Sequence, residues 1–233
     1  MNFYGKLIVS LAVVAGIAAG LLAFTYKTTA PVIAQREIED KAKALENVFF
    51  LQRKDGTLAL QGKEIAPGVT ALYQPDNQDK PAYYAVTGEA IGYNSGVPVS
   101  LMVGFTGPAA DPATLLEGYV DADKMPAKGK DGEYIVGFSV INSEETPGLG
   151  EKIKDARPPY TWIQALTGTK PAPNPDVSTD FQRQFRGRLA DSLVLKKNGG
   201  DLDAITASTI TSTGVVSALR DASGKLHNAL AAR

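Results

Sequence analysis

The sequence predicts an α+β protein in which a single N-terminal transmembrane helix and a stalk helix precede a domain with a mostly antiparallel sheet. Three observations predict this fold class. An uncharged run stands near the start of the chain, a segment with helical spacing of apolar residues follows it, and from about Gly56 β-forming runs alternate with turn residues. We therefore divide the chain into an anchor (1–27), a stalk helix and linker (28–55) and one domain (56–233).

The expected anchor is the run from Leu7 to Tyr26, which contains no charged residue and lies between Lys6 and Lys27. As a helix, its roughly 20 residues would span about 30 Å, the thickness of the hydrocarbon core of a bilayer. A cleavable signal peptide is the alternative. Such a peptide has a shorter apolar segment of about 7–15 residues, and no clear cleavage site precedes Lys27, so the sequence favours an uncleaved anchor.

The stalk helix is expected over Pro31–Phe50, because proline suits a first helical turn and the apolar residues after it lie near one face. Runs of β-forming residues predict the strands of the domain. The run Tyr134–Ile141 is almost entirely apolar, so we expect it to be central in the sheet. A further helix is expected over Thr161–Leu166. The predicted strands are Thr57–Leu60, Ala82–Gly88, Val97–Phe105 and Tyr134–Ile141.

The composition argues against several functional classes. A formal net charge of −1 gives no support for nucleic-acid binding. Cysteine is absent and His227 is the single histidine, which disfavours cysteine-held clusters, histidine-rich metal sites and Ser–His triads. Any redox chemistry would therefore need a bound organic cofactor. Arg183, Arg186 and Arg188 could meet a phosphate or an acidic partner, but we favour a solvated loop.

Two stretches are candidates for a binding site. The first, Asp203–Val216, is rich in hydroxyl side chains and runs into a helix marked by Val215, Val216 and Leu219. It could be a helix entry capped by Ser or Thr, which spacing alone favours, or a phosphate site at a helix N-terminus. The second, Glu144–Ile153, follows the most apolar strand. It could be an ordinary Pro-Gly turn or a loop whose glycines let the backbone approach a ligand.

Both stretches resemble one family. Asp203-x-x-Thr206-Ala207-Ser208-Thr209 resembles the Asp-x-x-Ser/Thr-Gly-Ala-Thr signature of flavinylated FMN-binding domains, with Ala207 in place of Gly and Ser208 in place of Ala. Glu145-Thr146-Pro147-Gly148-Leu149-Gly150 is similar to a second signature of that family. Trp162, Gln164 and Gly168 resemble a third segment. The order of the three motifs along the chain favours this family over the plainer interpretations.

The resemblance implies that FMN is joined through a phosphoester to Thr209 by a dedicated flavin transferase that uses FAD. It implies that Asp203 is a recognition or turn residue, and that Thr206 and Ser208 support the turn. Ala207 would resist the positive φ that glycine accepts freely. The backbone N–H groups of Ile210, Thr211 and Ser212 would lie near the phosphate. The flavin ring would be flanked by Glu145, Thr146, Gly148, Leu149 and Gly150.

These implications describe a membrane-anchored electron-transfer subunit with other membrane subunits as partners. The G subunit of Rnf-type ion-translocating complexes fits better than the C subunit of sodium-translocating NADH:quinone reductases. The resemblance places the large domain on the extracytoplasmic side of the cytoplasmic (inner) membrane, whereas the charges flanking the anchor leave its orientation open. A flavin-free structural or assembly subunit and a Ser or Thr hydrolase are the alternatives from other classes. We predict no metal site and no nucleic-acid partner.

Overall fold

The structure is a computed structural model that describes residues 3–49, 60–75, 77–94, 96–109, 134–154 and 178–232. The chain divides into two compact units, 1–42 and 43–233, and each is described here by itself. The first unit is helical. The second is built on an antiparallel sheet with helices, as the α+β prediction requires.

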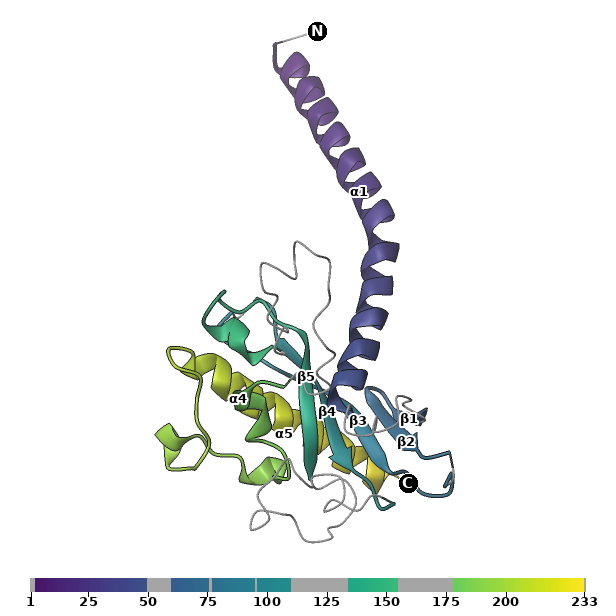
Figure 1. The fold of residues 1–233 in the computed structure, drawn as a ribbon. Coiled ribbons are helices and arrows are strands. Elements are labelled where there is room, and N and C mark those ends of the chain that lie inside the picture. The colour runs from purple at the N-terminus through teal and green to yellow at the C-terminus, as the bar shows by residue number, and fades with distance from the viewer. Residues whose placement is uncertain are drawn as a thin grey trace, which may run out of the picture. The chain divides into compact units, whose positions relative to one another are not determined.

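Helix α1 (Phe3–Val48) is continuous and contains all the described residues of the first unit (Figure 1). One part of it is long and apolar enough to cross a membrane, and no residue of that part is buried within the protein. Pro31 lies inside the helix and not in a first helical turn, which corrects the predicted helix start. Its ring nitrogen cannot donate to the carbonyl four residues earlier. Nearby hydroxyl groups bond back to the helix, as from Thr29 to the carbonyl oxygen of Thr25 at 2.8 Å.

The sheet of the second unit contains five strands in the order β1-β2-β3-β4-β5, and each neighbouring pair is antiparallel (Figure 1). Strands β3, β4 and β5 correspond to three of the predicted runs. Strands β1 and β2 were not predicted. The predicted strand at 57–60 lies outside the described residues except for Leu60, and the helix expected at 161–166 lies outside them entirely. The strands are β1 (Gln61–Ala66), β2 (Val69–Tyr73), β3 (Tyr83–Ala90), β4 (Val99–Thr106) and β5 (Ile135–Asn142).

Strand β5 is the last strand in the order of the described sheet, so the prediction that it is central was wrong. Ile135, Val136 and Phe138 are nevertheless buried in the cores on the two faces of the sheet, and the chain near residues 182–188 covers this edge. The N–H of Ile135 donates to the carbonyl of Arg188 at 3.0 Å, and the N–H of Gly187 donates to the carbonyl of Ile135 at 2.8 Å. The ring of Phe185 packs edge-on against that of Phe138. Covering an edge in this way prevents pairing with another chain.

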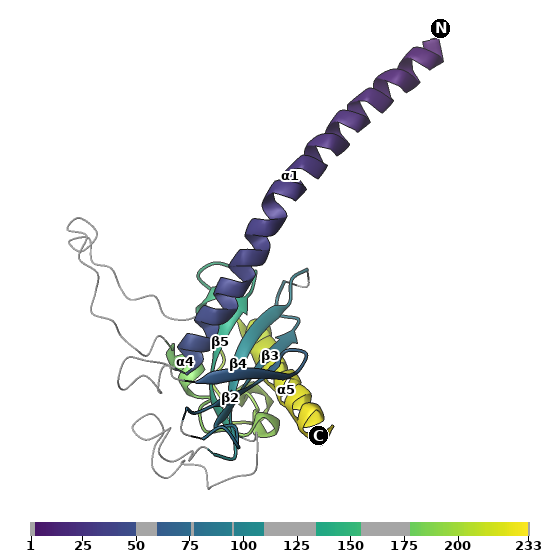
Figure 2. The same cartoon turned by 90° about the vertical axis from the view of Figure 1, so that its right-hand side faces the viewer.

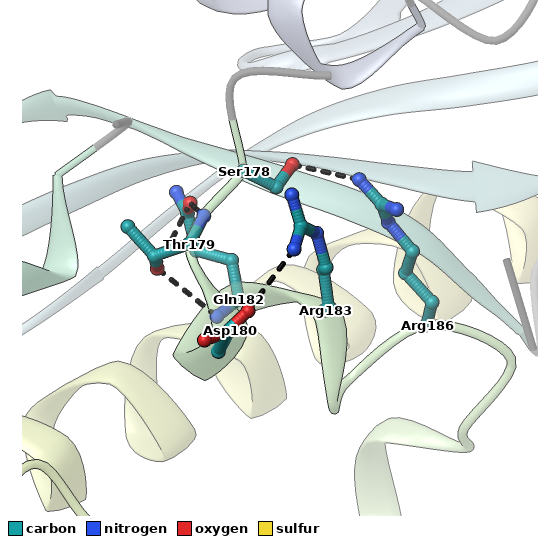
Figure 3. A network of polar contacts seen from close by, with 6 residues as sticks. All are labelled: Ser178, Thr179, Asp180, Gln182, Arg183 and Arg186. Atoms are coloured by element: carbon teal, nitrogen blue, oxygen red, sulfur yellow. Dashed lines mark hydrogen bonds and ion pairs between the residues drawn. The ribbon is translucent and has the colours of Figure 1, made fainter. Parts of the chain in front are cut away.

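Polar contacts hold this covering segment in place (Figure 3). Thr179 and Gln182 form a capping box at the start of the short helix α4 (Asp180–Arg183). Arg186 is 4% exposed and donates to Ser178 Oγ at 2.7 Å. The preference for a solvated basic loop was therefore wrong for Arg186.

The other two arginines of that group are also engaged. Arg183 pairs with Asp180 at 3.0 Å, and Arg188 pairs with Asp201 at 2.6 Å. The hydrogen bond and charge of the Arg188 guanidinium hold the pKa of Asp201 below its ordinary value. Asp180, Arg183 and Asp201 are exposed and Arg188 is half-buried, so each pair contributes little to the free energy of unfolding.

The last helix, α5 (Thr209–Ala231), packs on one face of the sheet, mainly against β3, and is drawn in yellow in Figure 2. Its buried residues include Val215, Leu219 and Leu226, which share a core with Val86 and Leu101. Helix and strand approach most closely at Gly88, where a Cβ atom would overlap the carbonyl oxygen of Ala218.

The opposite face of the sheet is covered by the end of α1 that belongs to the second unit. Ala44, Val48 and Phe49 are buried there in a cluster with side chains of β2 to β5. Gly104 of β4 leaves room for them, because a Cβ at this position would lie 2.5 Å from Val48 Cγ1 and 2.9 Å from the ring of Phe49. The second unit therefore has three layers, with the sheet between two helical segments.

We predict that Gly88→Ala lowers the free energy of unfolding by about 1–3 kcal/mol, because the new methyl group meets the backbone of α5 and the helix must move away. Gly224→Ala on the same helix is the matched control. A Cβ there meets nothing within 4 Å, so alanine should stabilise the helix by about 0.5–1 kcal/mol. Denaturant unfolding in detergent, followed by circular dichroism, measures both. Equal effects of the two changes would contradict the close approach.

Candidate functional site

A pocket of about 410 Å³ lies in the second unit where α5 begins. Its volume falls in the range of small-molecule sites, about 300–1,000 Å³. The wall combines hydroxyl and backbone groups with apolar side chains that are partly exposed to solvent. The lining residues are Tyr93, Thr146, Leu149, Gly150, Ala207, Ser208, Thr209, Ile210 and Thr211.

One wall is the turn that leads into α5. The N–H of Ser208 donates to the carbonyl of Ile205 at 2.9 Å, which closes a β-turn. Ala207 is its third residue and has φ +60°, the sign that a type II turn requires at that position. Glycine adopts this conformation readily and alanine does so at a cost. Ala207 therefore adopts the positive φ that we expected it to resist, and the turn still forms.

The hydroxyl groups around this turn do not cap the helix in the way that spacing alone favours. Ser208 occupies the N-cap position, but its side chain makes no capping hydrogen bond. Instead, Ser212 Oγ donates to the carbonyl of Ser208 at 2.9 Å and accepts from the N–H of Ile205 at 3.0 Å. The N–H groups of the first turn of α5 thus have no side-chain cap, and the residues that bear them line the pocket, an arrangement suited to an anion.

A second wall is the loop after β5. The N–H of Leu149 donates to the carbonyl of Thr146 at 3.1 Å, and Gly148 has φ +75°. With Pro147 before Gly148, this is the Pro-Gly turn expected from the sequence. The turn brings Thr146, Leu149 and Gly150 to the pocket, so the interpretations as a turn and as a binding loop are compatible.

Glu145 joins the two walls from behind. Thr211 Oγ1 donates to Glu145 Oε2 at 2.6 Å, and the N–H of Tyr93 donates to Glu145 Oε1 at 3.0 Å. Glu145 is 7% exposed and Thr211 is 1% exposed. These bonds connect the loop after β3, the loop after β5 and the start of α5 into one rigid site.

Most of the predicted site residues line the pocket, and the others lie near it. Ser212 and Glu145 are buried outside the lining, where they hold the turn and the loop. Gly148 lies at the turn, and Thr206 is exposed. The predicted residues in the lining are Thr146, Leu149, Gly150, Ala207, Ser208, Thr209, Ile210 and Thr211.

Asp203 is exposed and does not line the pocket. Lys196 Nζ contacts both of its carboxylate oxygens, at 2.7 and 2.8 Å. The side chain of Gln184 bonds to both the N–H and the carbonyl of Asp203, at 2.8 and 2.9 Å. These contacts fix the chain before the turn at Ile205. The third motif (Trp162, Gln164 and Gly168) lies outside the described residues.

Comparison with known proteins connects the pocket and α1 to a single family. Residues 124–224 match the family model of the FMN-binding domain, and residues 9–48 match the model of the RnfG N-terminal region. The chain is 31% identical over 168 residues to the G subunit of an ion-translocating oxidoreductase complex of Yersinia pestis, with 70% of this chain and 72% of the relative covered. The chain belongs to the family of G subunits of ion-translocating oxidoreductase complexes.

Relatives in other organisms extend the match along the chain. The corresponding G subunit of Methanosarcina acetivorans is 29% identical over 227 residues, covering 93% of this chain and 91% of the relative. That of Vibrio cholerae is 27% identical over 212 residues, covering 91% and 85%. The part that matches the FMN-binding domain contains every residue of the pocket lining except Tyr93.

In this member of the G-type family, Tyr93 is the lining residue that the sequence did not indicate. It follows β3, and its side chain is 65% exposed. An aromatic residue near Gly92 and Gly96 is an ordinary feature of a loop. Its position in the pocket depends on Glu145, which is 52 residues away in the sequence.

We predict that Ala207→Gly raises the free energy of unfolding by about 0.5–1 kcal/mol, because glycine removes the cost of a positive φ and this gain exceeds the added entropy of the unfolded chain. Ala204→Gly is the control in the same segment. Ala204 has no positive φ, so its replacement by glycine should destabilise by a similar amount. Denaturant unfolding distinguishes the two, and a destabilising Ala207→Gly would contradict the left-handed conformation.

Proposed function

We propose that this protein is the membrane-anchored electron-transfer subunit of an ion-translocating oxidoreductase complex, and that it carries FMN through a phosphoester bond to Thr209. The observation that carries the proposal is the pocket at the start of α5. It brings together residues of the two signatures within the part of the chain that matches an FMN-binding domain.

The residues of the pocket fit FMN. Its phosphate could accept from the uncapped N–H groups of the first turn of α5. The flat ring could contact the exposed apolar side chains of Tyr93, Leu149 and Ile210, which all line the pocket. FMN, when bound, supplies exchange of one or two electrons, and the protein supplies binding, orientation and electrostatics.

Burial favours Thr209 over its neighbours as the attachment point. Thr209 lines the pocket and is partly exposed, and within the described part of the chain its hydroxyl group forms no hydrogen bond. Thr211 is almost fully buried and donates to Glu145. Ser212 is buried and donates to the carbonyl of Ser208. A transferase would therefore find the Thr209 hydroxyl accessible.

The attachment reaction balances with FAD as the donor. The Thr209 oxygen forms a bond to the phosphorus of the FMN half, the bond between the two phosphates of FAD breaks, AMP leaves and the hydroxyl proton passes to solvent or base. The start of α5 then stabilises the remaining negative charge by about 0.3–1 kcal/mol, or up to about 2 kcal/mol when partly buried. That attraction is too weak to retain FMN in an open pocket, which is the physical reason for a covalent bond.

The proposal also covers the location of the protein in the membrane and its partner proteins. Residues 1–27 anchor it in the inner membrane, 28–55 form the stalk and linker, and 56–233 form the FMN-binding domain on the extracytoplasmic side. Its partners are the other membrane subunits of the complex and a flavin transferase. The apolar part of α1 and the match to the RnfG N-terminal region support the anchor and the choice of the Rnf-type G subunit over the C subunit.

The position of His227 counts against a hydrolase. It is exposed near the C-terminal end of α5, whereas the hydroxyl groups of the pocket lie at its first turn. A rise of 1.5 Å per residue separates His227 from Thr209 by about 27 Å along the helix. The sole histidine of the chain therefore cannot activate these hydroxyl groups.

We expect a truncated chain that begins at Lys27 to be soluble and folded without detergent, because it lacks the uncharged run but keeps the whole second unit. Gel filtration and circular dichroism test this, with the full-length chain in detergent as the control. Aggregation of the truncated chain that detergent reverses would show that the domain itself is membrane-embedded.

We expect Thr209→Val to abolish covalent flavin, since valine has nearly the same shape as threonine but no hydroxyl group. Thr211→Val is the matched control and should keep the flavin. Each protein is produced with a flavin transferase, and flavin fluorescence of the denatured band in a gel is read together with the intact mass. The unaltered protein should gain the mass of FMN less one water on the peptide with Thr209. Flavin that survives Thr209→Val but is lost in Thr211→Val would move the site, and a colourless protein would favour a flavin-free subunit.

A further inference from the structure

The carboxylate of Glu145 lies directly behind the pocket wall. A Cβ atom at Gly150 would lie 2.7 Å from Glu145 Oε2 and 2.8 Å from Thr211 Oγ1. Gly150 and Thr211 both line the pocket, whereas Glu145 does not. A wall made of a glycine and a short hydroxyl side chain therefore separates this carboxylate from whatever the pocket holds.

Both oxygens of Glu145 act as hydrogen-bond acceptors, one from the N–H of Tyr93 and one from Thr211 Oγ1. A carboxylate, which can only accept, satisfies both of these donors. In the parts of the chain that the structure describes, no basic side chain forms an ion pair with Glu145. Its negative charge is therefore buried and is not neutralised by a neighbouring cation.

We propose that Glu145 is a positioning residue that also lowers the reduction potential of the flavin in the pocket. The inference rests on the proposed function. Reduction adds electrons to the ring, and a fixed negative charge close by opposes that addition. The opposition is strong in this place because burial limits screening by water and salt. The carboxylate thus favours release of electrons to the next carrier.

The adjacent residue offers a matched control. Glu144 is in the same loop and carries the same type of side chain, but it is exposed. Water and ions screen its charge, so removing it should change the potential little. If removing the charge shifts the reduction potential at Glu145 and not at Glu144, the shift reports the buried position of the charge and not the net charge of the protein.

The test uses the full chain in detergent, flavinylated with a flavin transferase, and a spectroscopic redox titration. Glu145→Gln keeps the shape, can still accept from the N–H of Tyr93, and can donate from its amide nitrogen to Thr211 Oγ1, whereas Glu145→Met keeps the approximate size and removes both hydrogen bonds. We expect both variants to titrate at a more positive potential than the unaltered protein, at low salt and at 1 M salt alike. Glu144→Gln should match the unaltered protein. Circular dichroism verifies the fold, and either Glu145 variant alone suffices if the other does not fold.

Several results would overturn the inference. Unchanged potentials in the folded Glu145 variants would show that the charge does not act on the ring, and a shift in Glu145→Met alone would assign the effect to hydrogen bonding. Loss of flavin from the Glu145 variants alone would make Glu145 necessary for attachment and would leave the proposed function intact. Absence of flavin from the unaltered protein would overturn the proposed function and this inference together.

Discussion

The close approach of α5 to β3 is the constraint on which the rest of the second unit depends. Helix and strand leave no room for a side chain at Gly88, and a Cβ at Gly214 would lie 3.0 Å from the carbonyl oxygen of Ile91. This spacing brings the first turn of α5 beside the loops that follow β3 and β5. Glu145 then joins the three segments through two hydrogen bonds. A larger residue at either glycine would separate the walls of the pocket.

Strands β3, β4 and β5 could be predicted because their runs are long and their side chains report burial, whereas strand β2 is also buried but is only five residues long and was missed. Runs at β3, β4 and β5 are apolar because both of their faces are covered. Strand β1 is mostly exposed and shows no such pattern, so its sequence looks like a loop. The position of β5 could not be deduced, because apolar composition reports burial and not the number of neighbouring strands. The cover near Phe185 supplies that burial from outside the sheet.

The site was predictable where its residues are close together in the sequence. The turn at Ala207 and the turn at Gly148 are each local, and each motif indicated its own segment. The bond between Thr211 and Glu145 joins residues that are 66 apart, and it depends on how the strands pair and where α5 packs. Between Thr209 and Thr211, the resemblance selects Thr209 by its place in the signature, and the burial of Thr211, which depends on packing, is an independent ground that the sequence could not supply.

The packing of the end of α1 on the sheet determines where proteolysis would leave the domain intact. Ala44, Val48 and Phe49 form part of the cover of the sheet, so the end of the helix and the residue after it are a piece of the folded core. A protease that cleaves before this segment would release a domain with all three of its layers. One that cleaves just after Phe49 would strip a layer and bare an apolar face, and the fragment would be prone to aggregate. The position of the cut relative to this segment thus decides whether the released domain stays in solution.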